Sequence, residues 1–493
     1  MGSSFVAWCL LCLLTAIRDV QPQAFYQPEQ IHLSYAAKPT EMVFTWVTFT
    51  DTGSVVEYGL SSSQLDMSAK GASEEFRDGG KEKRIIFMHR VTVTGLSSGQ
   101  MYNYHVGSPN GWSSLYTFTA MKNGTDFSTT FALYGDLGNG NGRSMGLLQK
   151  MAETGKFDFV VHTGDFAYDM HDDNARKGDQ FMRQIESIAT YVPYMTCVGN
   201  HEAAYNFSNY KYRFTMPDAG GDGRGLWYSY DVGPVHFIAW DTEVYYENQG
   251  PDDIVGKQYG WLEEDLIKAN RNREMRPWII TYGHRPMYCS NTFSGQKELD
   301  HCINPSNPIR VGDPSKGWQG VENLFYKYGV DVQVAAHEHS YERMWPVYNM
   351  RVCNGSRAPY TNPNAPVHIV TGSAGNSEHQ SPFFRVPWVW SAKRSDDYGF
   401  NIIKVHNKTH INIQFLSQNK DGAIIDEIML IKDQHGEDIY TCGAGMDTDY
   451  DARKKSEFQK IVNYFEYKAK KLKEKERRMQ MENDFYFEDF ERL

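Results

Sequence analysis

Three segments of the chain, FALYGDLGNG (131–140), FDFVVHTGDFAYDM (157–170) and YVPYMTCVGNHE (191–202), follow one pattern. Each begins with a short apolar run and ends in a glycine beside a polar side chain that can bind a metal ion. Apolar runs of this length, bounded by turn residues, are typical of strands buried on both faces of a sheet. Because ligands of an open α/β sheet gather at the carboxyl ends of its strands, the pattern predicts a binding site there.

Apolar strands alternate with helical patterns through residues 127–435. Three segments space their apolar residues as a helix does: RSMGLLQKMAETG (143–155), QYGWLEEDLIKANRNRE (258–274) and VENLFYKYG (321–329). This alternation predicts a layered α/β domain, with sheets flanked by helices. Two further runs, NIIKVH (401–406) and HINIQF (410–415), alternate apolar and polar residues and predict an antiparallel hairpin that closes the domain.

Residues 24–122 have a different pattern, which predicts an all-β domain. Short runs rich in β-branched and aromatic residues, such as MVFTWVTF (42–49) and RIIFMHRVTV (84–93), are separated by Gly, Ser, Asp and Lys. About six or seven such strands suit an immunoglobulin-like sandwich, and VTGLSSGQMYNYHV (93–106) resembles the tyrosine-bearing corner of fibronectin type III domains. No metal-binding or nucleophilic constellation occurs here, so we expect a packing or partner-binding domain.

The two ends of the chain lie outside these domains. Residues 1–23 include FVAWCLLCLLTAI (5–17), an apolar core of the length found in signal peptides. Residues 450–493 form a charged tail in which apolar residues recur at helical spacing. This tail predicts an amphipathic helix, which either folds back on the body or lies on a membrane surface or a partner protein.

Cysteine usage indicates an exported protein. Cys289 and Cys302 bracket a polar loop and form the favoured disulfide pair, with Cys353 and Cys442 as a second candidate pair. Cys197 lies inside an apolar run and is expected to be a buried free thiol. Together with the signal segment, this pattern predicts that the protein is secreted or resides in the lysosome or another lumenal compartment.

The remaining composition limits the class of partner. Four N-x-S/T sequons, which mark possible glycosylation, lie at Asn123, Asn206, Asn354 and Asn407.

The net charge of −11 argues against nucleic acid as a partner, because phosphate backbones attract basic surfaces. An acidic protein can still bind phosphorylated compounds where metal ions supply positive charge. The sequence does not determine the oligomeric state.

Five short motifs carry the residues that can bind metal. They are GDLG with Asp136, GDFAY with Asp165 and Tyr168, GNHE with Asn200 and His201, GH with His284, and HEH with His337 and His339. Each motif follows directly on an apolar run, so we expect the polar residues to converge at one edge of the sheet. Carboxylate, phenolate, amide and imidazole donors together suit iron, zinc or manganese.

The seven of these residues other than His201 are too many ligands for one ion, but they divide into two sets of four when one carboxylate is shared. Asp165 is the natural bridge, because a carboxylate has two oxygens. Asn200 is a neutral ligand and so leaves the site with the positive charge that an anionic substrate needs. Two ions about 3.5–4 Å apart form the usual clamp for in-line displacement at phosphorus.

The five motifs, in this order, resemble those of the metallophosphoesterases. Tyr168 and the N-terminal sandwich narrow the resemblance to purple acid phosphatases of the long, two-domain type, over residues 25–435. The resemblance implies an acid phosphatase in which a metal-bound hydroxide attacks a phosphate monoester. It implies that Fe(III) is held by Asp136, Asp165, Tyr168 and His339. It implies that a divalent ion, Fe, Zn or Mn, is held by Asp165, Asn200, His284 and His337.

The resemblance also implies how the site treats its substrate. Asn200 and His201 would contact the phosphate, and His201 would help the leaving group to depart. Glu202 is expected to support the site by accepting a hydrogen bond from a ligand or from His201. Arg343 could meet phosphate, although an ion pair with a nearby carboxylate is favoured. Three further histidines lie in strand runs and are expected to be core residues: His162, His236 and His368.

Two positions depart from the family pattern. Ala336 stands where the last motif usually has glycine, and if this position needs a positive φ, alanine costs about 1 kcal/mol or more. Family members also commonly have a histidine, an acid or substrate contact, a little after the one that matches His284. Here that place falls in SNTFSGQ (290–296), which has none. His301 either reaches the site, if the loop folds inward, or stays on the surface.

Two alternatives to an acid phosphatase remain open. One keeps the dinuclear site but gives it zinc or manganese and makes the protein a phosphodiesterase or nucleotide hydrolase; a visible band from a tyrosinate–iron pair would exclude it. The other is a secreted binding glycoprotein whose metal site is only structural. Retention of every ligand argues against the second, because structural sites seldom leave positions open for water.

Overall fold

The computed structural model describes residues 23–218, 220–246, 253–292, 302–355, 357–442 and 471. The chain divides into two compact units, Met1–Cys442 and Gly443–Leu493, and the description below concerns the first. The predictions for the signal segment, for His301 and for the C-terminal tail fall outside the described residues, apart from Gln23 and Lys471. No helix in the described part of the chain is long and apolar enough to cross a membrane.

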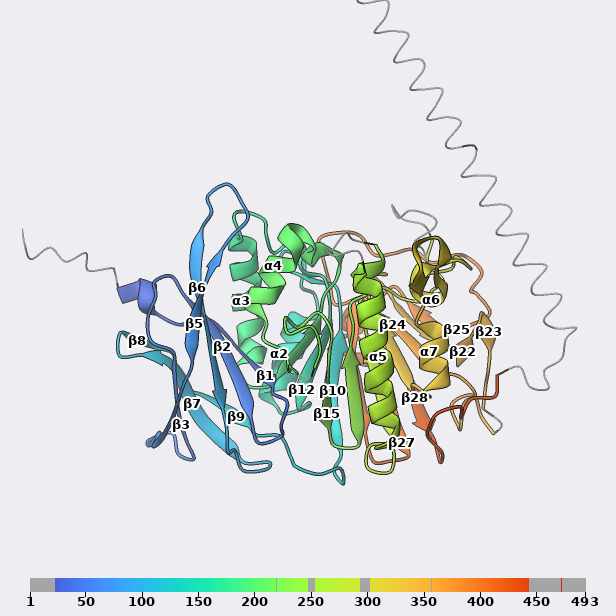
Figure 1. The fold of residues 1–493 in the computed structure, drawn as a ribbon, viewed down its shortest axis with the longest axis horizontal. Helices are drawn as coiled ribbons and strands as arrows, with labels where there is room; N and C mark the ends of the chain where they lie inside the picture. Colours follow the sequence, from blue (N-terminus) through green and yellow to red (C-terminus); the bar gives the residue numbers. More distant parts are fainter. Residues whose placement is uncertain are drawn as a thin grey trace, which may run out of the picture. The chain divides into compact units, whose positions relative to one another are not determined.

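The N-terminal part is a sandwich of two antiparallel sheets, as predicted (Figure 1). The first sheet has the order β1-β2-β6-β5, with bounds β1 Glu29–Tyr35, β2 Met42–Thr48, β5 Ala72–Arg77 and β6 Ile85–Val93. The second has the order β4-β3-β7-β8, with β9 beside β7, and bounds β3 Val55–Gly59, β4 Met67–Lys70, β7 Met101–Ser108, β8 Gly111–Trp112 and β9 Tyr116–Thr119. Strands β4 and β5 read MSAK and ASEEFR, too polar for the apolar alternation that reveals strands in a sequence.

Aromatic side chains from both sheets fill the sandwich core. The ring of Phe44 in β2 lies 4.8 Å from that of Tyr104 in β7 and 5.3 Å from that of Phe118 in β9. The hydroxyl of Tyr102 accepts a hydrogen bond of 3.0 Å from the backbone N–H of Ser97. This is the bond expected of the tyrosine-bearing corner.

The sandwich packs against helix α3 (Arg176–Ala189) of the following domain. Leu33 of β1 forms a parallel bridge with Pro193, just before strand β14 (Tyr194–Cys197). Tyr104 donates a hydrogen bond of 2.6 Å to the carbonyl of Thr190 at the end of α3. The two domains therefore share buried contacts.

Two mixed sheets form the α/β domain. The six-stranded sheet has the order β14-β12-β10-β26-β27-β28, with bounds β10 Thr129–Tyr134, β12 Phe159–Thr163, β14 Tyr194–Cys197, β26 Gly399–Val405, β27 His410–Ser417 and β28 Ala423–Ile431. The seven-stranded sheet has the order β15-β16-β17-β20-β24-β21-β25, with bounds β15 Tyr228–Val232, β16 Val235–Ala239, β17 Trp278–Tyr282, β20 Val332–Ala335, β21 Tyr341–Met344, β24 Val367–Thr371 and β25 Ser391–Ser395. In the first, β10, β12 and β14 run parallel; in the second, β16, β17, β20 and β24 do so.

Aromatic residues join the facing sides of the two sheets. Phe237 of β16 lies 5.3 Å from Phe131 of β10 and 5.6 Å from Phe159 of β12, measured between ring centroids. Tyr341 of β21 stacks on Phe415 of β27 at 3.9 Å. The apolar runs that predicted buried strands thus form the layer between the sheets.

Helices complete the layers, and they include the three predicted segments (Figure 1). Besides α3, the helices are α2 Met145–Glu153, α4 Ala204–Arg213, α5 Ile254–Asn270, α6 Pro308–Val311 and α7 Glu322–Lys327. Short strands are β11 Leu137–Gly138, β13 Phe166–Ala167, β18 Gly312–Asp313, β19 Trp318–Gln319, β22 Val347–Tyr348 and β23 Arg351–Val352. Short 3-10 helices are η1 Gln23–Tyr26, η2 Asn200–Glu202, η3 Glu243–Tyr245, η4 Pro314–Lys316 and η5 Gln418–Lys420. The predicted hairpin is β26–β27, with Ile403 opposite Ile413.

The structure also pairs four of the cysteines. Cys289 is joined to Cys302 and Cys353 to Cys442, with Cα atoms 5.6 and 5.3 Å apart. Cys197 is a buried free thiol in β14. The asparagines of all four sequons are exposed to solvent.

Candidate metal centre

The candidate ligands lie at strand ends of both sheets. Oxygen donors follow β10, β12, β13 and β14, on the side of the six-stranded sheet: Asp136, Asp165, Tyr168 and Asn200. Imidazoles follow β17 and β20 of the seven-stranded sheet: His284, His337 and His339. The prediction that all of these residues lie at one edge of a single sheet is therefore wrong. An apolar run shows that a strand is buried, but it does not show which sheet the strand joins.

Several candidate ligands have a left-handed backbone conformation. The φ angle is +60° at Asp136, +57° at Asp165, +55° at Tyr168 and +67° at His337. Each such conformation costs a non-glycine residue about 1 kcal/mol or more, so the surrounding structure must hold it in place. Clusters of strained residues of this kind indicate functional sites.

Ala336, which replaces the usual glycine, carries no such strain. It is not among the residues with positive φ, so the expected penalty does not arise. The glycine that the packing requires is Gly135, where an added Cβ would lie 2.3 Å from the Cβ of Ala336. The alanine methyl fills the space that Gly135 leaves.

One group of candidate ligands is formed by Asp136, Tyr168 and His339. The hydroxyl of Tyr168 donates to Oδ1 of Asp136 at 3.0 Å and lies 2.8 Å from Nε2 of His339. The same His339 nitrogen is 3.4 Å from Oδ1 of Asp136. All three side chains are buried, so their donor atoms converge in a space shielded from water.

A second group surrounds Nε2 of His284. This nitrogen is 3.1 Å from Oδ2 of Asp165, 3.2 Å from Oδ1 of Asn200 and 3.1 Å from Nδ1 of His337. The backbone N–H of His337 donates to Oδ2 of Asp136 at 2.9 Å, which links this group to the first.

The second nitrogens of the three imidazoles are also held. Nδ1 of His284 lies 2.9 Å from the carbonyl oxygen of Thr163, and Nδ1 of His339 lies 2.8 Å from that of His379. Such contacts fix the ring with its other nitrogen toward the site. His337 differs, because its Nε2 lies 3.0 Å from Nη1 of Arg285.

Glu202 supports the loops that carry two of the candidate ligands. Its buried carboxylate accepts backbone hydrogen bonds from Asp165 at 2.9 Å, Phe166 at 2.8 Å and Gly199 at 2.8 Å. These bonds join the turn after β12 to the turn after β14. Glu202 therefore accepts a hydrogen bond from a candidate ligand, as predicted, through the backbone N–H of Asp165.

His201 stands beside both groups, among three carboxylates. Its Nδ1 lies 2.8 Å from Oδ1 of Asp169. Its Nε2 lies 3.9 Å from Oδ2 of Asp165 and 3.6 Å from Oε1 of Glu378. This arrangement turns Nε2 toward the candidate ligands.

Burial and neighbouring charges together determine the protonation of the candidate ligands. Burial, together with Asp136 and Asp165, raises the pKa of Tyr168 well above its ordinary value. Burial and the nearby Arg285 hold the pKa of His337 well below its usual range, so this imidazole is neutral, as a metal ligand must be. Burial acts to raise the pKa of Asp165, but the neighbouring histidines outweigh it and lower that pKa, so the carboxylate is ionised.

Other predicted residues lie outside the two groups. Arg343 forms the favoured ion pair: it binds both oxygens of Asp426, at 2.7 and 2.8 Å. His162 is buried with Nδ1 2.8 Å from the hydroxyl of Tyr194. His236 lies between Asp231 and Asp265, at 2.7 and 2.9 Å.

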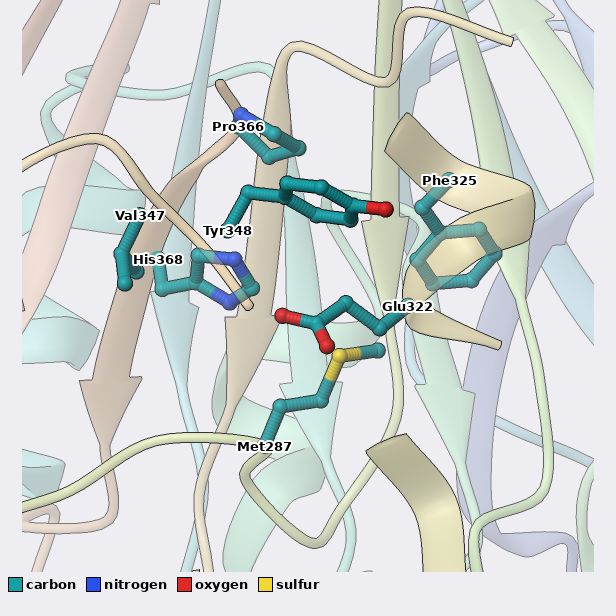
Figure 2. Close-up of a pocket in the computed structure, with 7 residues that line it drawn as sticks. All are labelled: Met287, Glu322, Phe325, Val347, Tyr348, Pro366 and His368. Atoms are coloured by element: carbon teal, nitrogen blue, oxygen red, sulfur yellow. The ribbon is translucent and has the colours of Figure 1, made fainter. Parts of the chain in front are cut away.

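His368 lines a small cavity away from the candidate ligands (Figure 2). Burial lowers its pKa to about 3, so the ring is neutral. The side chain of Glu322 points into the same space from α7. The cavity is lined by Met287, Glu322, Phe325, Val347, Tyr348, Pro366 and His368.

Sequence reasoning missed three residues at the site: Asp169, Arg285 and Glu378. Asp169 directly follows Tyr168, and Arg285 directly follows His284, so their adjacency to ligands was a signal that could have found them. Glu378 lies in the loop after β24, and the local sequence offers no comparable signal.

The donor set fits two metal ions. The first group offers carboxylate and phenol oxygens with one imidazole, and the second offers carboxylate and amide oxygens with two imidazoles. Hard oxygen donors suit Fe(III), while mixed oxygen and imidazole donors suit a borderline divalent ion such as zinc. Asp165 has two carboxylate oxygens: Oδ2 lies 3.1 Å from Nε2 of His284, and Oδ1 accepts the backbone N–H of His201 at 3.0 Å.

Three family models match successive parts of the chain. The model described as "Purple acid Phosphatase, N-terminal domain" matches residues 28–120. "Calcineurin-like phosphoesterase" matches residues 129–341, and "Iron/zinc purple acid phosphatase-like protein C" matches residues 365–427.

Relatives match over most of their length. "Acid phosphatase type 7" of Homo sapiens is 48% identical over 436 residues, which cover 88% of this chain and 98% of the relative. "Fe(3+)-Zn(2+) purple acid phosphatase 12" of Arabidopsis thaliana is 28% identical over 424 residues, or 82% of this chain and 84% of the relative. The solved purple acid phosphatase from yellow lupin (Lupinus luteus) seeds has the same fold, with a TM-score of 0.70 at 23% identity over 86% of this chain and 78% of that chain.

Proposed function

Because the chain belongs to the purple acid phosphatase family, we propose that side chains from the facing sheet ends build its dinuclear metal centre. The protein is an acid phosphatase, a hydrolase that acts on small phosphate monoesters. Its metal ligands are Asp136, Asp165, Tyr168, Asn200, His284, His337 and His339. The observation that carries this assignment is the convergence of their donor atoms in two groups, with neighbouring donor atoms of each group 2.8–3.4 Å apart, from strand ends far apart in the chain.

The two contact groups support a division between the ions. Fe(III) is assigned to Asp136, Asp165, Tyr168 and His339. A divalent ion, Fe, Zn or Mn, is assigned to Asp165, Asn200, His284 and His337. The harder oxygen donors of the first group favour Fe(III), and a relative carries Fe(3+) and Zn(2+) in its name.

The ions and the side chains have separate tasks in hydrolysis. When bound, the two ions supply positive charge for the phosphoryl oxygens and lower the pKa of the attacking water. Asn200 contributes a neutral oxygen, so it does not cancel the positive charge that attracts phosphate. Asp169 orients His201 through Nδ1 and leaves Nε2 facing the site, where it can donate a proton to the leaving-group oxygen.

A secreted or lysosomal location is part of the proposal. The two disulfides support it, because such bonds persist in oxidising compartments. The four exposed sequon asparagines agree with export.

Hydrolysis of an aryl phosphate by iron- and zinc-loaded protein tests the assignment. Asp165→Ala removes the shared ligand and should lower kcat at least about a thousandfold, since both ions lose a ligand. Asp66→Ala, at an exposed position of the sandwich, is the matched control and should hydrolyse the substrate at the wild-type rate. Wild-type activity no higher than that of Asp165→Ala would refute the proposal.

A further inference from the structure

A carboxylate stands at the entrance to the site, beside the proposed proton donor. Oε1 of Glu378 lies 3.6 Å from Nε2 of His201, and Oε2 lies 4.0 Å from Nε2 of His339. The side chain of Glu378 is 55% exposed, whereas those of His201 and His339 are 17% and 10% exposed. Glu378 therefore lies on the solvent side of these two histidines.

The negative charge of Glu378 is not paired with a fixed cation. In the described part of the chain, no lysine or arginine forms an ion pair with it. Its 3.6 Å contact with Nε2 of His201 is longer than a hydrogen bond. Asp169 differs, because its Oδ1 lies 2.8 Å from Nδ1 of His201. The carboxylate of Glu378 is thus able to interact with a molecule that enters the site.

The loop that carries Glu378 is attached on both sides to segments that carry candidate ligands. Before Glu378, the carbonyl of Gly375 accepts a hydrogen bond of 2.8 Å from the backbone N–H of Gly138 in β11. After Glu378, the carbonyl oxygen of His379 lies 2.8 Å from Nδ1 of His339. The backbone of Glu378 therefore has a defined position beside the site.

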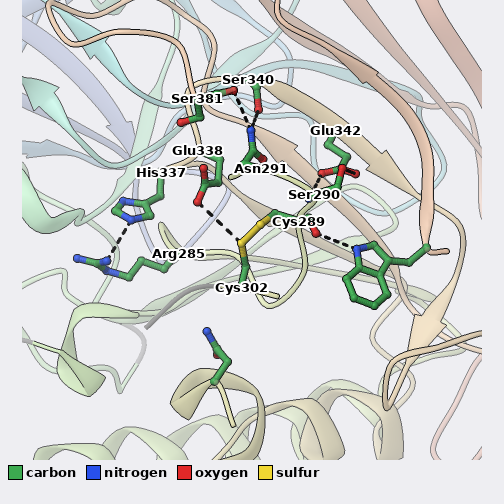
Figure 3. Close-up of a disulfide and its surroundings, with 12 residues drawn as sticks. Arg285, Cys289, Ser290, Asn291, Cys302, His337, Glu338, Ser340, Glu342 and Ser381 are labelled. Carbon is green, nitrogen blue, oxygen red and sulfur yellow. Dashed lines mark hydrogen bonds between the residues drawn. A yellow bond between two sulfur atoms is a disulfide. The ribbon is translucent and has the colours of Figure 1, made fainter. Parts of the chain in front are cut away.

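Ser381 fixes the same loop further along. Its hydroxyl accepts the backbone N–H of His339 at 2.9 Å, and its carbonyl accepts a hydrogen bond of 3.0 Å from Nδ2 of Asn291. Nδ2 of Asn291 also donates to the hydroxyl of Ser340 at 3.0 Å, as Figure 3 shows. The loop is thereby joined to the connection between β20 and β21, which carries two of the candidate histidine ligands.

From this arrangement we propose that Glu378 determines specificity, and that it favours phosphate monoesters whose leaving group carries a positive charge. The inference rests on the proposed function, in which Nε2 of His201 donates a proton to the leaving-group oxygen. A leaving group that extends from this oxygen toward solvent passes the carboxylate of Glu378. The carboxylate attracts an ammonium group there and repels a carboxylate or a second phosphate.

The two parts of a substrate thus meet opposite charges. The metal centre attracts the phosphoryl group, which is the same in every monoester. Glu378 acts on the leaving group, which differs from one monoester to another. Its charge therefore changes the ratio of kcat/KM between substrates, which is the measure of specificity.

The experiment measures kcat/KM of the full-length, metal-loaded protein for three phenyl phosphates. They carry an aminomethyl, a hydroxymethyl or a carboxylate group at the meta position, so their leaving groups are cationic, neutral or anionic. Glu378→Gln removes the charge and keeps the size of the side chain. The ratio of kcat/KM for the cationic ester to that for the anionic ester should fall about threefold to tenfold, as expected for charges about 6–8 Å apart near water. Comparison with wild type cancels the intrinsic reactivity of each ester.

Further variants separate a charge effect from a structural one. Glu378→Lys reverses the charge and should lower the ratio further than Glu378→Gln does. Glu378→Asp keeps the charge and should retain most of the wild-type preference. Glu427→Gln is the matched control, because it removes an exposed carboxylate of β28 that accepts hydrogen bonds from the neutral amides of Asn412 and Gln414. Its ratio should equal that of wild type.

The outcomes distinguish the inference from the function on which it rests. A ratio that stays at the wild-type value in both Glu378→Gln and Glu378→Lys overturns the inference. An equal loss of kcat/KM for all three esters also overturns it, because this result would mark a purely structural role. Wild-type protein that hydrolyses none of the three esters would instead refute the proposed function itself.

Discussion

His236 provides a pH-dependent contribution to the stability of the catalytic domain. It lies in β16 with Nδ1 2.7 Å from Oδ1 of Asp231 and Nε2 2.9 Å from Oδ2 of Asp265. Its side chain is only 14% exposed. Both ring nitrogens therefore face a carboxylate in a largely dry environment, and the perturbation we consider is His236→Gln.

The pKa of His236 determines the size and the sign of the effect. Burial acts to lower this pKa, but hydrogen bonds with Asp231 and Asp265 outweigh it and raise the pKa from 6.5 to about 9. At about 1.4 kcal/mol per unit, this difference corresponds to about 3 kcal/mol of stability. Because the folded-state pKa is the higher one, the contribution is fully present below about pH 6.5 and is lost as the pH rises through about 9.

Urea unfolding of wild type and His236→Gln, at about pH 5.5, 7.5 and 9.5, measures this contribution. The stability gap between the two proteins should be about 3 kcal/mol larger at the lowest pH than at the highest. Ile238→Val, in the same strand β16, is the control and should change stability equally at each pH, because neither side chain has an ionisable group. A gap for His236→Gln that is the same at all three pH values would refute the reasoning.

Three predictions concern the metal centre. Tyr168→Phe removes the phenolate and should abolish the visible band of the iron-loaded protein; a retained band would contradict the Fe(III) assignment. His201→Gln removes the proton donor and should lower kcat about 100- to 10,000-fold, while the metal content stays unchanged. A near-normal kcat would show that another group donates the proton. Glu202→Ala leaves three buried backbone N–H groups without an acceptor, which costs about 1–3 kcal/mol for each group. Urea unfolding should therefore show a free energy of unfolding that is lower by at least about 3 kcal/mol. An unchanged midpoint would argue against this role of Glu202.

The candidate ligands could be predicted because their signal is local. Asp136, Asp165 and His284 each follow the end of a buried strand by two residues, and an apolar run followed by glycine is visible in a sequence without any tertiary information. The two-layer arrangement could not be predicted in the same way. Whether a strand joins the carboxylate-bearing or the imidazole-bearing sheet depends on pairing between distant segments.

Adjacency to a ligand could draw attention to Asp169 and Arg285, but it could not predict which side chains they contact. Asp169 follows Tyr168 with a φ of +87°, and its carboxylate lies beside Nδ1 of His201. Arg285 follows His284, yet it contacts the other face of a ligand 52 residues further along. Side-chain direction at such positions depends on backbone conformations that apolar periodicity does not encode.

Contacts run from the sandwich through helix α3 to the backbone of Tyr168. Arg84, directly before β6 of the sandwich, forms an ion pair with Asp179 of α3, and the buried Arg213 of α4 pairs with the same carboxylate at 2.9 Å. From the same helix, Lys177 donates to the backbone carbonyl of Tyr168, the proposed iron ligand. Because Tyr168 has a strained, left-handed backbone, it needs such support to keep its hydroxyl beside the other ligands. The N-terminal domain therefore contacts the helix that supports the backbone of this candidate ligand.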